Sequence, residues 1–173
     1  MKATIDAASF DDYACVYNDI SVCNPLTVYI RAHNVKFDQV PAANTEDMRF
    51  LAFQGQLSTE GVAFAGIYND NGTVKWFIKY HNGADFVIVL GNEVSINTNY
   101  DMELGFYYDG VTGWCKLWIN GDLECEATDK DTDLYAPNYA MAGFVYSDAP
   151  DSYDAHVLMD CIYIDDDYGG PEA

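Results

Sequence analysis

Hydrophobic and polar residues alternate along this chain in one run after another, and this period of two constrains the fold more than any other feature. In residues 100–108, Met102, Leu104 and Phe106 fall on one side of an extended chain and Asp101 falls on the other. Successive side chains of a β-strand point to opposite faces, so the pattern predicts half-buried strands. No segment keeps the apolar spacing of three to four residues that a long helix needs, so no long helix is expected.

Short clusters of Gly, Asn, Asp and Pro separate these runs and predict tight turns. Asn120-Gly121 is the strongest hairpin signal, and residues 69–72 predict a second hairpin. About twelve short strands joined in this way predict an all-β antiparallel sandwich or barrel. No linker or internal repeat divides the sequence, so a single domain is predicted over residues 1–173. The clearest strand predictions are residues 26–37, 48–53, 62–68, 73–80, 85–90, 100–108, 114–119, 139–146 and 156–164.

The charge of the chain excludes several classes of partner. The chain contains only 8 Lys and Arg residues but 28 Asp and Glu residues, which gives a formal net charge of −20. Nucleic-acid affinity depends on Lys and Arg that neutralise phosphates, so no nucleic-acid partner is expected. The same charge disfavours anionic membranes and carboxylated or sulfated glycans unless a divalent cation bridges them. No apolar stretch of about 18 residues predicts a membrane span, and no apolar segment of a secretory signal follows Met1.

Five cysteines lie at positions 15, 23, 115, 125 and 161, and none forms the C-x-x-C pair of a structural zinc site. If residues 18–20 form a hairpin loop, Cys15 and Cys23 lie opposite each other and can bridge, so their oxidation state stays open. A two-residue turn at 120–121 pairs Cys115 with Glu126, which predicts opposite faces for Cys115 and Cys125.

Residues 97–124 carry a more specific pattern, in which an aromatic residue opens a strand, an Asp-Gly…Gly turn follows, and the next strand ends in a hydrophobic-Asn-Gly hairpin. This segment resembles the concanavalin A-like lectin/glucanase superfamily, particularly its laminin G-like members. Residues 28–41 and 160–165 resemble an early and the closing strand of the same family, with Cys161 departing from the usual Asp. The resemblance implies a jelly-roll β-sandwich and says little about function, because that fold hosts lectins, enzymes and surface proteins. The matching positions are Tyr100, Asp109, Gly110, Gly113, Ile119, Asn120 and Gly121.

Catalytic patterns of that superfamily are weak in this sequence. The E-x-D-x-x-E strand that its glycosidases share is absent, and Glu124 and Glu126 form the nearest carboxylate pair. The resemblance implies that a lyase of this superfamily would use Tyr and His residues to abstract a proton, and basic residues to neutralise a uronate. Residues 79–81 offer Lys, Tyr and His, but alternation turns the Tyr away from the other two. His33 and His156 stand alone in strands, where packed histidines are commoner than catalytic ones, so the sequence predicts a protein that is not an enzyme.

Calcium is the one cofactor that the sequence suggests, because hard oxygen ligands are abundant. Asp129, Asp131 and Asp133 alternate in one segment, although Leu134 stands where a calcium-binding EF-hand loop requires Gly. Asp6 and Asp160 could also meet if the terminal strands pair as the resemblance implies.

Exposed aromatic rings with polar neighbours are the usual platform for a sugar. The leading prediction is therefore a non-catalytic glycan-binding or adhesion module working through a concave sheet. The alternative is a structural surface or display protein that contacts a protein partner or assembles with itself, and a glycan hydrolase or lyase comes third. The first two functions would place the protein outside the cell, on a cell surface or on a virion. The candidate ligand-binding residues are Trp76, Tyr80, Tyr107, Trp114 and Trp118.

Overall fold

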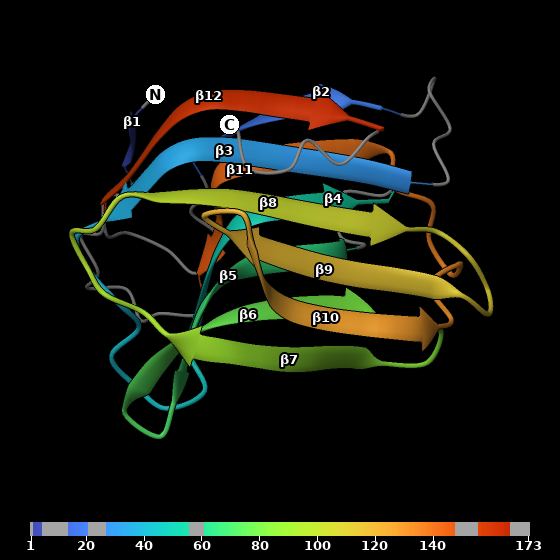
Figure 1. Cartoon of the computed structure of the whole chain (residues 1–173), viewed down its shortest axis with the longest axis horizontal. Coiled ribbons are helices and arrows are strands. Elements are labelled where there is room, and N and C mark those ends of the chain that lie inside the picture. Colours follow the sequence, from blue (N-terminus) through green and yellow to red (C-terminus); the bar gives the residue numbers. More distant parts are fainter. Residues whose placement is uncertain (1, 5–13, 21–26, 56–60, 148–155, 167–173) are drawn as a thin grey trace.

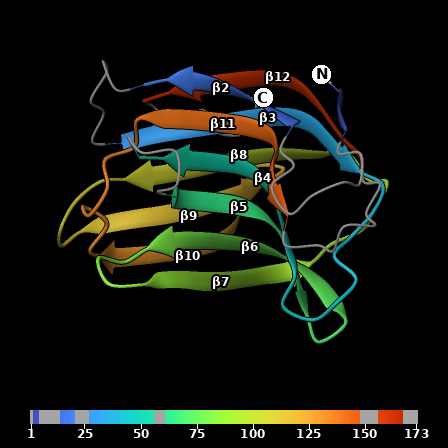
Figure 2. The ribbon, with the colours of Figure 1, turned by 180° about the vertical axis from the view of Figure 1, so that it is seen from behind.

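Two six-stranded antiparallel sheets pack face to face in a computed structural model, which describes residues 2–4, 14–20, 27–55, 61–147 and 156–166 (Figures 1 and 2). Within these ranges the structure contains strands, turns and loops but no helix, which confirms the predicted antiparallel sandwich. No helix there is long and apolar enough to cross a membrane.

The first sheet, sheet A, faces the viewer in Figure 1 and holds both terminal strands. Its order is β1 (Lys2–Thr4), β12 (His156–Asp165), β3 (Thr27–Phe37), β8 (Tyr100–Tyr107), β9 (Gly113–Ile119) and β10 (Asp122–Lys130). The second sheet, sheet B, is in front in Figure 2. Its order is β2 (Ala14–Asp19), β11 (Tyr139–Ser147), β4 (Asp47–Gln54), β5 (Gly61–Asp70), β6 (Thr73–His81) and β7 (Phe86–Glu93).

The core between the sheets is built by the apolar half of each alternating strand. In β3, Val28, Ile30 and Ala32 are at most 2% exposed, while the residues between them are only partly buried. Aromatic rings from both sheets meet there, and Phe37 stacks on Phe50 with their centroids 5.3 Å apart. Burial of these apolar faces fixes the register, because a slip of one residue would turn each strand inside out.

A β-bulge corrects the prediction for Cys115 and Cys125. Cys125 pairs with Leu117, not with the residue that a regular hairpin would give it, because the register shifts between Leu123 and Cys125. The extra residue, Glu124, restores the inward parity of the strand. Both thiols therefore face the core, where Cys115 is 0% and Cys125 3% exposed.

Residues 18–20 do not form the hairpin loop on which the possible Cys15–Cys23 bridge depended, because β2 continues through Asn18 and Asp19. These two residues pair with Ala140 and Tyr139 of β11. Cys15 carries a free thiol, and Cys23 lies outside the described residues.

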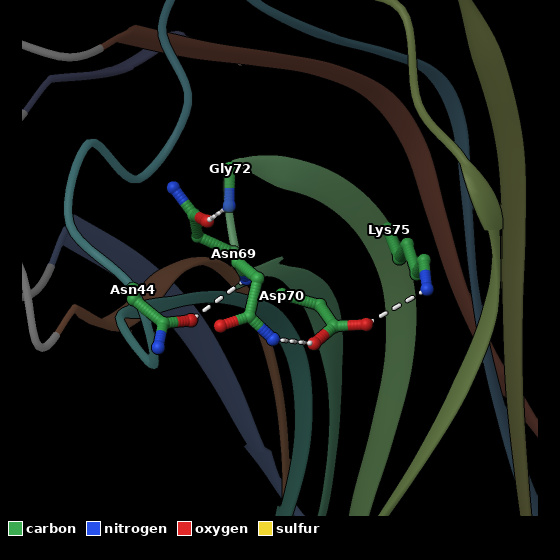
Figure 3. A network of polar contacts seen from close by, with 6 residues as sticks. Asn44, Asn69, Asp70, Gly72 and Lys75 are labelled. Carbon is green, nitrogen blue, oxygen red and sulfur yellow. Dashed lines mark hydrogen bonds and ion pairs between the residues drawn. The ribbon is translucent and has the colours of Figure 1, made fainter.

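The β5–β6 hairpin is tied to the loop before β4 by a polar network (Figure 3). The buried Asn69 side chain donates to the Pro41 carbonyl oxygen at 2.9 Å and accepts the Gly72 N–H at 2.8 Å. Lys75 reaches Asp70 at 2.8 Å, and this hydrogen-bonded cation lowers the pKa of the Asp70 carboxyl. The network satisfies an amide that would otherwise be costly to bury.

The reactivity of the cysteine thiols can test the bulge that turns Cys115 and Cys125 into the core. Burial raises the pKa of Cys125 to about 12 and raises that of Cys115 further, so neither forms much thiolate at pH 8. We expect a disulfide reagent followed by peptide mapping to label the exposed Cys161 quickly, and to label Cys115 and Cys125 only as the protein unfolds. Labelling of Cys125 in the folded protein as fast as Cys161 would contradict the bulge.

Candidate functional site

Alternation in β3 and β9 places a second set of side chains on the outer face of sheet A. The residues between the core positions of β3 are Tyr29, Arg31 and His33, and those of β9 include Trp114 and Trp118. β8 lies between these strands and pairs with both, so the two sets face the same side of one sheet.

Four of these outward aromatic residues, Tyr29, Tyr107, Trp114 and Trp118, form a cluster that we call the aromatic platform. The Tyr29 ring lies 5.8 Å from Trp114 and 6.1 Å from Trp118, measured between centroids. Tyr107 extends the cluster at 6.2 Å from Trp114. All four side chains are partly exposed, so their rings remain open to a ligand.

Gly105 of β8 makes room for the platform. A Cβ atom at this position would lie 2.8 Å from the Tyr29 ring and 2.9 Å from the Trp114 ring. Contacts this short require the neighbours to move, so the rings can lie over the middle of the sheet only because residue 105 has no side chain.

A row of polar residues crosses three neighbouring strands beside the platform. Tyr163 of β12 pairs with Arg31 of β3, and Arg31 pairs with Glu103 of β8. Arg31 donates to both Glu103 carboxylate oxygens, with Nη2–Oε1 at 3.1 Å and Nε–Oε2 at 3.3 Å. Glu103 is 5% exposed, so the pair fixes a guanidinium whose remaining N–H groups stay available. Tyr163 is 53% exposed, so much of its phenol ring lies at the surface.

His33 lies next to this row and is oriented by a carboxylate. Its Nδ1 lies 3.3 Å from Asp101 Oδ1, which also accepts the Asn34 N–H at 3.1 Å. A carboxylate at that distance favours the proton on Nδ1 and leaves a lone pair on Nε2. His33 Nε2 is buried without a hydrogen-bond partner, and the Tyr163 ring stands edge-on to the imidazole at 5.9 Å. His33 thus has the oriented, unoccupied lone pair of a general base.

The outer face of sheet B is different in chemistry. Arg49 binds Asp47 through two hydrogen bonds of 2.8 and 2.9 Å and lies 4.7 Å over the Phe64 ring. On the same face His81 Nδ1 accepts the Gly83 N–H at 3.2 Å. That bond occupies the lone pair of the neutral ring and places the proton on Nε2, so His81 can donate but is poorly set to accept.

The structure divides the five predicted ligand-binding residues between the two sheets. Trp76 and Tyr80 are 3% and 2% exposed in the core, so the expectation that they belong to a surface platform is wrong. Their side of β6 faces inward, which leaves Lys79 and His81 outside as alternation predicted. The structure brings Tyr107, Trp114 and Trp118 together on sheet A, and their contact with a ligand stays a prediction.

The calcium candidates do not converge in the described part of the chain. No group of three or more His, Cys, Asp or Glu residues is placed there to hold a metal ion. Asp131 and Asp133 are neighbours, and a shared hydrogen bond raises the pKa of Asp133. Asp129 and Asp160 are exposed, and Asp6 lies outside the described residues, so calcium binding stays a prediction.

The sequence did not single out Arg31, His33 or Tyr163 as a site. Alternation in residues 27–37 places the first two on one side, which is a usable signal. Tyr163 comes from the other end of the chain, and only the pairing of β12 with β3 brings it beside them.

No family model and no curated protein matches the chain. Solved structures do match. A polysaccharide lyase family 18 structure, aly-SJ02, has a TM-score of 0.60 and 8% identity over 93% of this chain and 82% of that one. A family 7 alginate lyase, A1-II′, in complex with substrate has a TM-score of 0.61 and 14% identity over 95% and 75%. An alginate lyase from Pseudomonas aeruginosa has a TM-score of 0.61 and 10% identity over 85% and 67%.

These matches show the fold, an antiparallel jelly-roll β-sandwich, as the sequence predicted. They contradict the leading functional prediction, a non-catalytic module, and with it the prediction that the chain is not an enzyme. The neighbours are catalytic polysaccharide lyases, the class that the sequence ranked last. The sequence contains no local lyase motif, so it gave no signal for this class.

Gly105→Ala tests the geometry of the platform. The added methyl group forces Tyr29 and Trp114 apart, and overpacking of this kind costs about 1–3 kcal/mol of unfolding free energy. We expect denaturant unfolding to show that loss, and the near-ultraviolet circular dichroism of the aromatic residues to change. An unaltered spectrum together with unaltered stability would mean that the rings do not lie over residue 105.

Proposed function

We propose that this chain is a polysaccharide lyase and that its substrate lies across the outer face of sheet A. The observation that carries the proposal is the meeting of His33, Arg31 and Tyr163 beside an open aromatic platform. The fold that the chain shares with solved alginate lyases supports it. The narrower laminin G-like resemblance remains part of this proposal. It rests on residues 28–41, 97–124 and 160–165, and the first two of these stretches contain the four residues of the platform.

Arg31 is the group suited to hold the carboxylate of a uronate. Its guanidinium is anchored by Glu103 through two N–H groups, so the remaining donors have a fixed direction. In a lyase the carboxylate gains charge when the proton on the adjacent carbon is removed, and a fixed cation stabilises that charge as it develops.

His33 and Tyr163 supply the proton steps. His33 Nε2 removes the proton next to the carboxylate, the freed electron pair forms a carbon–carbon double bond, and the bond to the glycosidic oxygen breaks. The Tyr163 hydroxyl gives its proton to the leaving oxygen and regains one from His33. Because Nε2 is buried in the free protein, the imidazole has to become exposed before Nε2 can reach the substrate.

The experiment is an assay of unsaturated product, followed by its ultraviolet absorbance, on a panel of uronate-containing polysaccharides. We expect His33→Gln to lower kcat by about 10²-fold or more, as loss of a general base does. Tyr163→Phe keeps the ring, removes the hydroxyl and is expected to act in the same direction.

Matched controls are available elsewhere in the chain. His156→Gln makes the same change on β12, where His156 pairs with Asp38 at 2.9 Å, and should leave activity unchanged. Tyr17→Phe does the same for an exposed tyrosine of sheet B. Full activity of the His33 variant, or no unsaturated product from any member of the panel, would reject the proposal.

A further inference from the structure

The charges on the outer face of sheet A are unevenly arranged around the platform. Arg31 lies on the side of His33 and Tyr163, while Glu126 is exposed on the opposite side, next to β9. Lys116 also borders the platform, but its ammonium lies 3.6 Å from Glu126 Oε2 and 5.4 Å over the Trp114 ring. A carboxylate bound over the platform would therefore compete with Glu126 for a cation already engaged.

We infer that the preferred substrate is a polysaccharide in which single uronates are separated by neutral sugars, and not a continuous polyuronate such as alginate. The inference rests on the proposed lyase activity and adds to it the class of substrate. One uronate is held at Arg31, and neutral sugars occupy the aromatic platform.

Electrostatic energy favours this division. Two like charges 4 Å apart repel by about 1 kcal/mol in water and about 4 kcal/mol at the effective dielectric constant of a protein surface. A polyuronate laid over the platform would bring further carboxylates toward Glu126, whose charge Lys116 offsets only in part, whereas a sparsely charged chain brings its carboxylate only to Arg31. The net charge of −20 adds a longer-range repulsion that salt screens beyond about 8 Å.

The platform suits neutral sugars for a second reason. Aromatic faces pack against the C–H-rich faces of pyranoses, and nearby carboxylates accept hydrogen bonds from hydroxyl groups. The paired positions Tyr163, Arg31, Glu103 and Trp118 cross four neighbouring strands. Arg31 and Trp118 are two inter-strand spacings apart, about 10 Å, so the face has room for neutral sugars between the reacting uronate and Trp118.

The first experiment compares kcat/KM on alginate with kcat/KM on deacetylated gellan, whose repeating unit holds one glucuronate among neutral sugars. We expect gellan to be favoured by at least about tenfold at low ionic strength, a difference of about 1.4 kcal/mol. The ratio should fall as salt screens the repulsion of the polyuronate. Equal or better cleavage of alginate would overturn the inference and leave the proposed lyase function intact.

A binding experiment is independent of catalysis. In affinity electrophoresis through gels containing neutral galactomannan, the wild-type protein should be retarded, and Trp118→Ala and Trp114→Ala should each lose most of the retardation. Phe86→Ala, which removes an exposed aromatic ring from sheet B, is the matched control and should migrate like wild type. Absence of retardation of the wild-type protein would overturn the inference even if no polymer were cleaved. If the protein cleaves neither polymer and no other uronate polysaccharide, the proposed lyase function is wrong.

Discussion

The burial of alternate side chains of β3 is the constraint on which the rest of the structure depends. Ile30 and Ala32 are 0% exposed, and burying an Ile side chain is worth about 1.5–3 kcal/mol. A strand has only two faces, so holding these residues in the core turns Arg31 and His33 outward. A register slip would exchange the two sets and forfeit the core. The site is therefore maintained by the same packing that holds the sandwich together.

Hydrogen bonding then decides which outer face can transfer a proton. Both sheets expose a histidine near cations and aromatic rings, but the two imidazoles are held differently. His81 Nδ1 accepts a hydrogen bond from the Gly83 N–H. His33 Nδ1 instead faces the Asp101 carboxylate, and His33 Nε2 has no hydrogen-bond partner. Proton abstraction needs an acceptor, so the proposed lyase chemistry fits the outer face of sheet A better than that of sheet B. The aromatic platform beside His33 gives that chemistry a surface on which a polysaccharide can lie.

The fold could be predicted from the sequence because alternation and turn residues are local signals. The two-residue hairpin turn at Asn120-Gly121 was predicted correctly, but the bulge at Glu124 was not, since a one-residue insertion leaves little trace in an alternating pattern. The outward parity of Trp114 and Trp118 was predictable, while the burial of Trp76 depends on which sheet β6 joins. Sites assembled across strands far apart in sequence need the strand order, which period-two patterns do not encode.

The most direct test of the central claim is a crystal structure of the His33→Asn variant with a bound oligosaccharide that contains one uronate. The account predicts sugar density across the outer face of sheet A, with the carboxylate at Arg31 and neutral rings stacked on the aromatic platform. Density for the oligosaccharide on the outer face of sheet B, over Arg49 and Phe64, would contradict it.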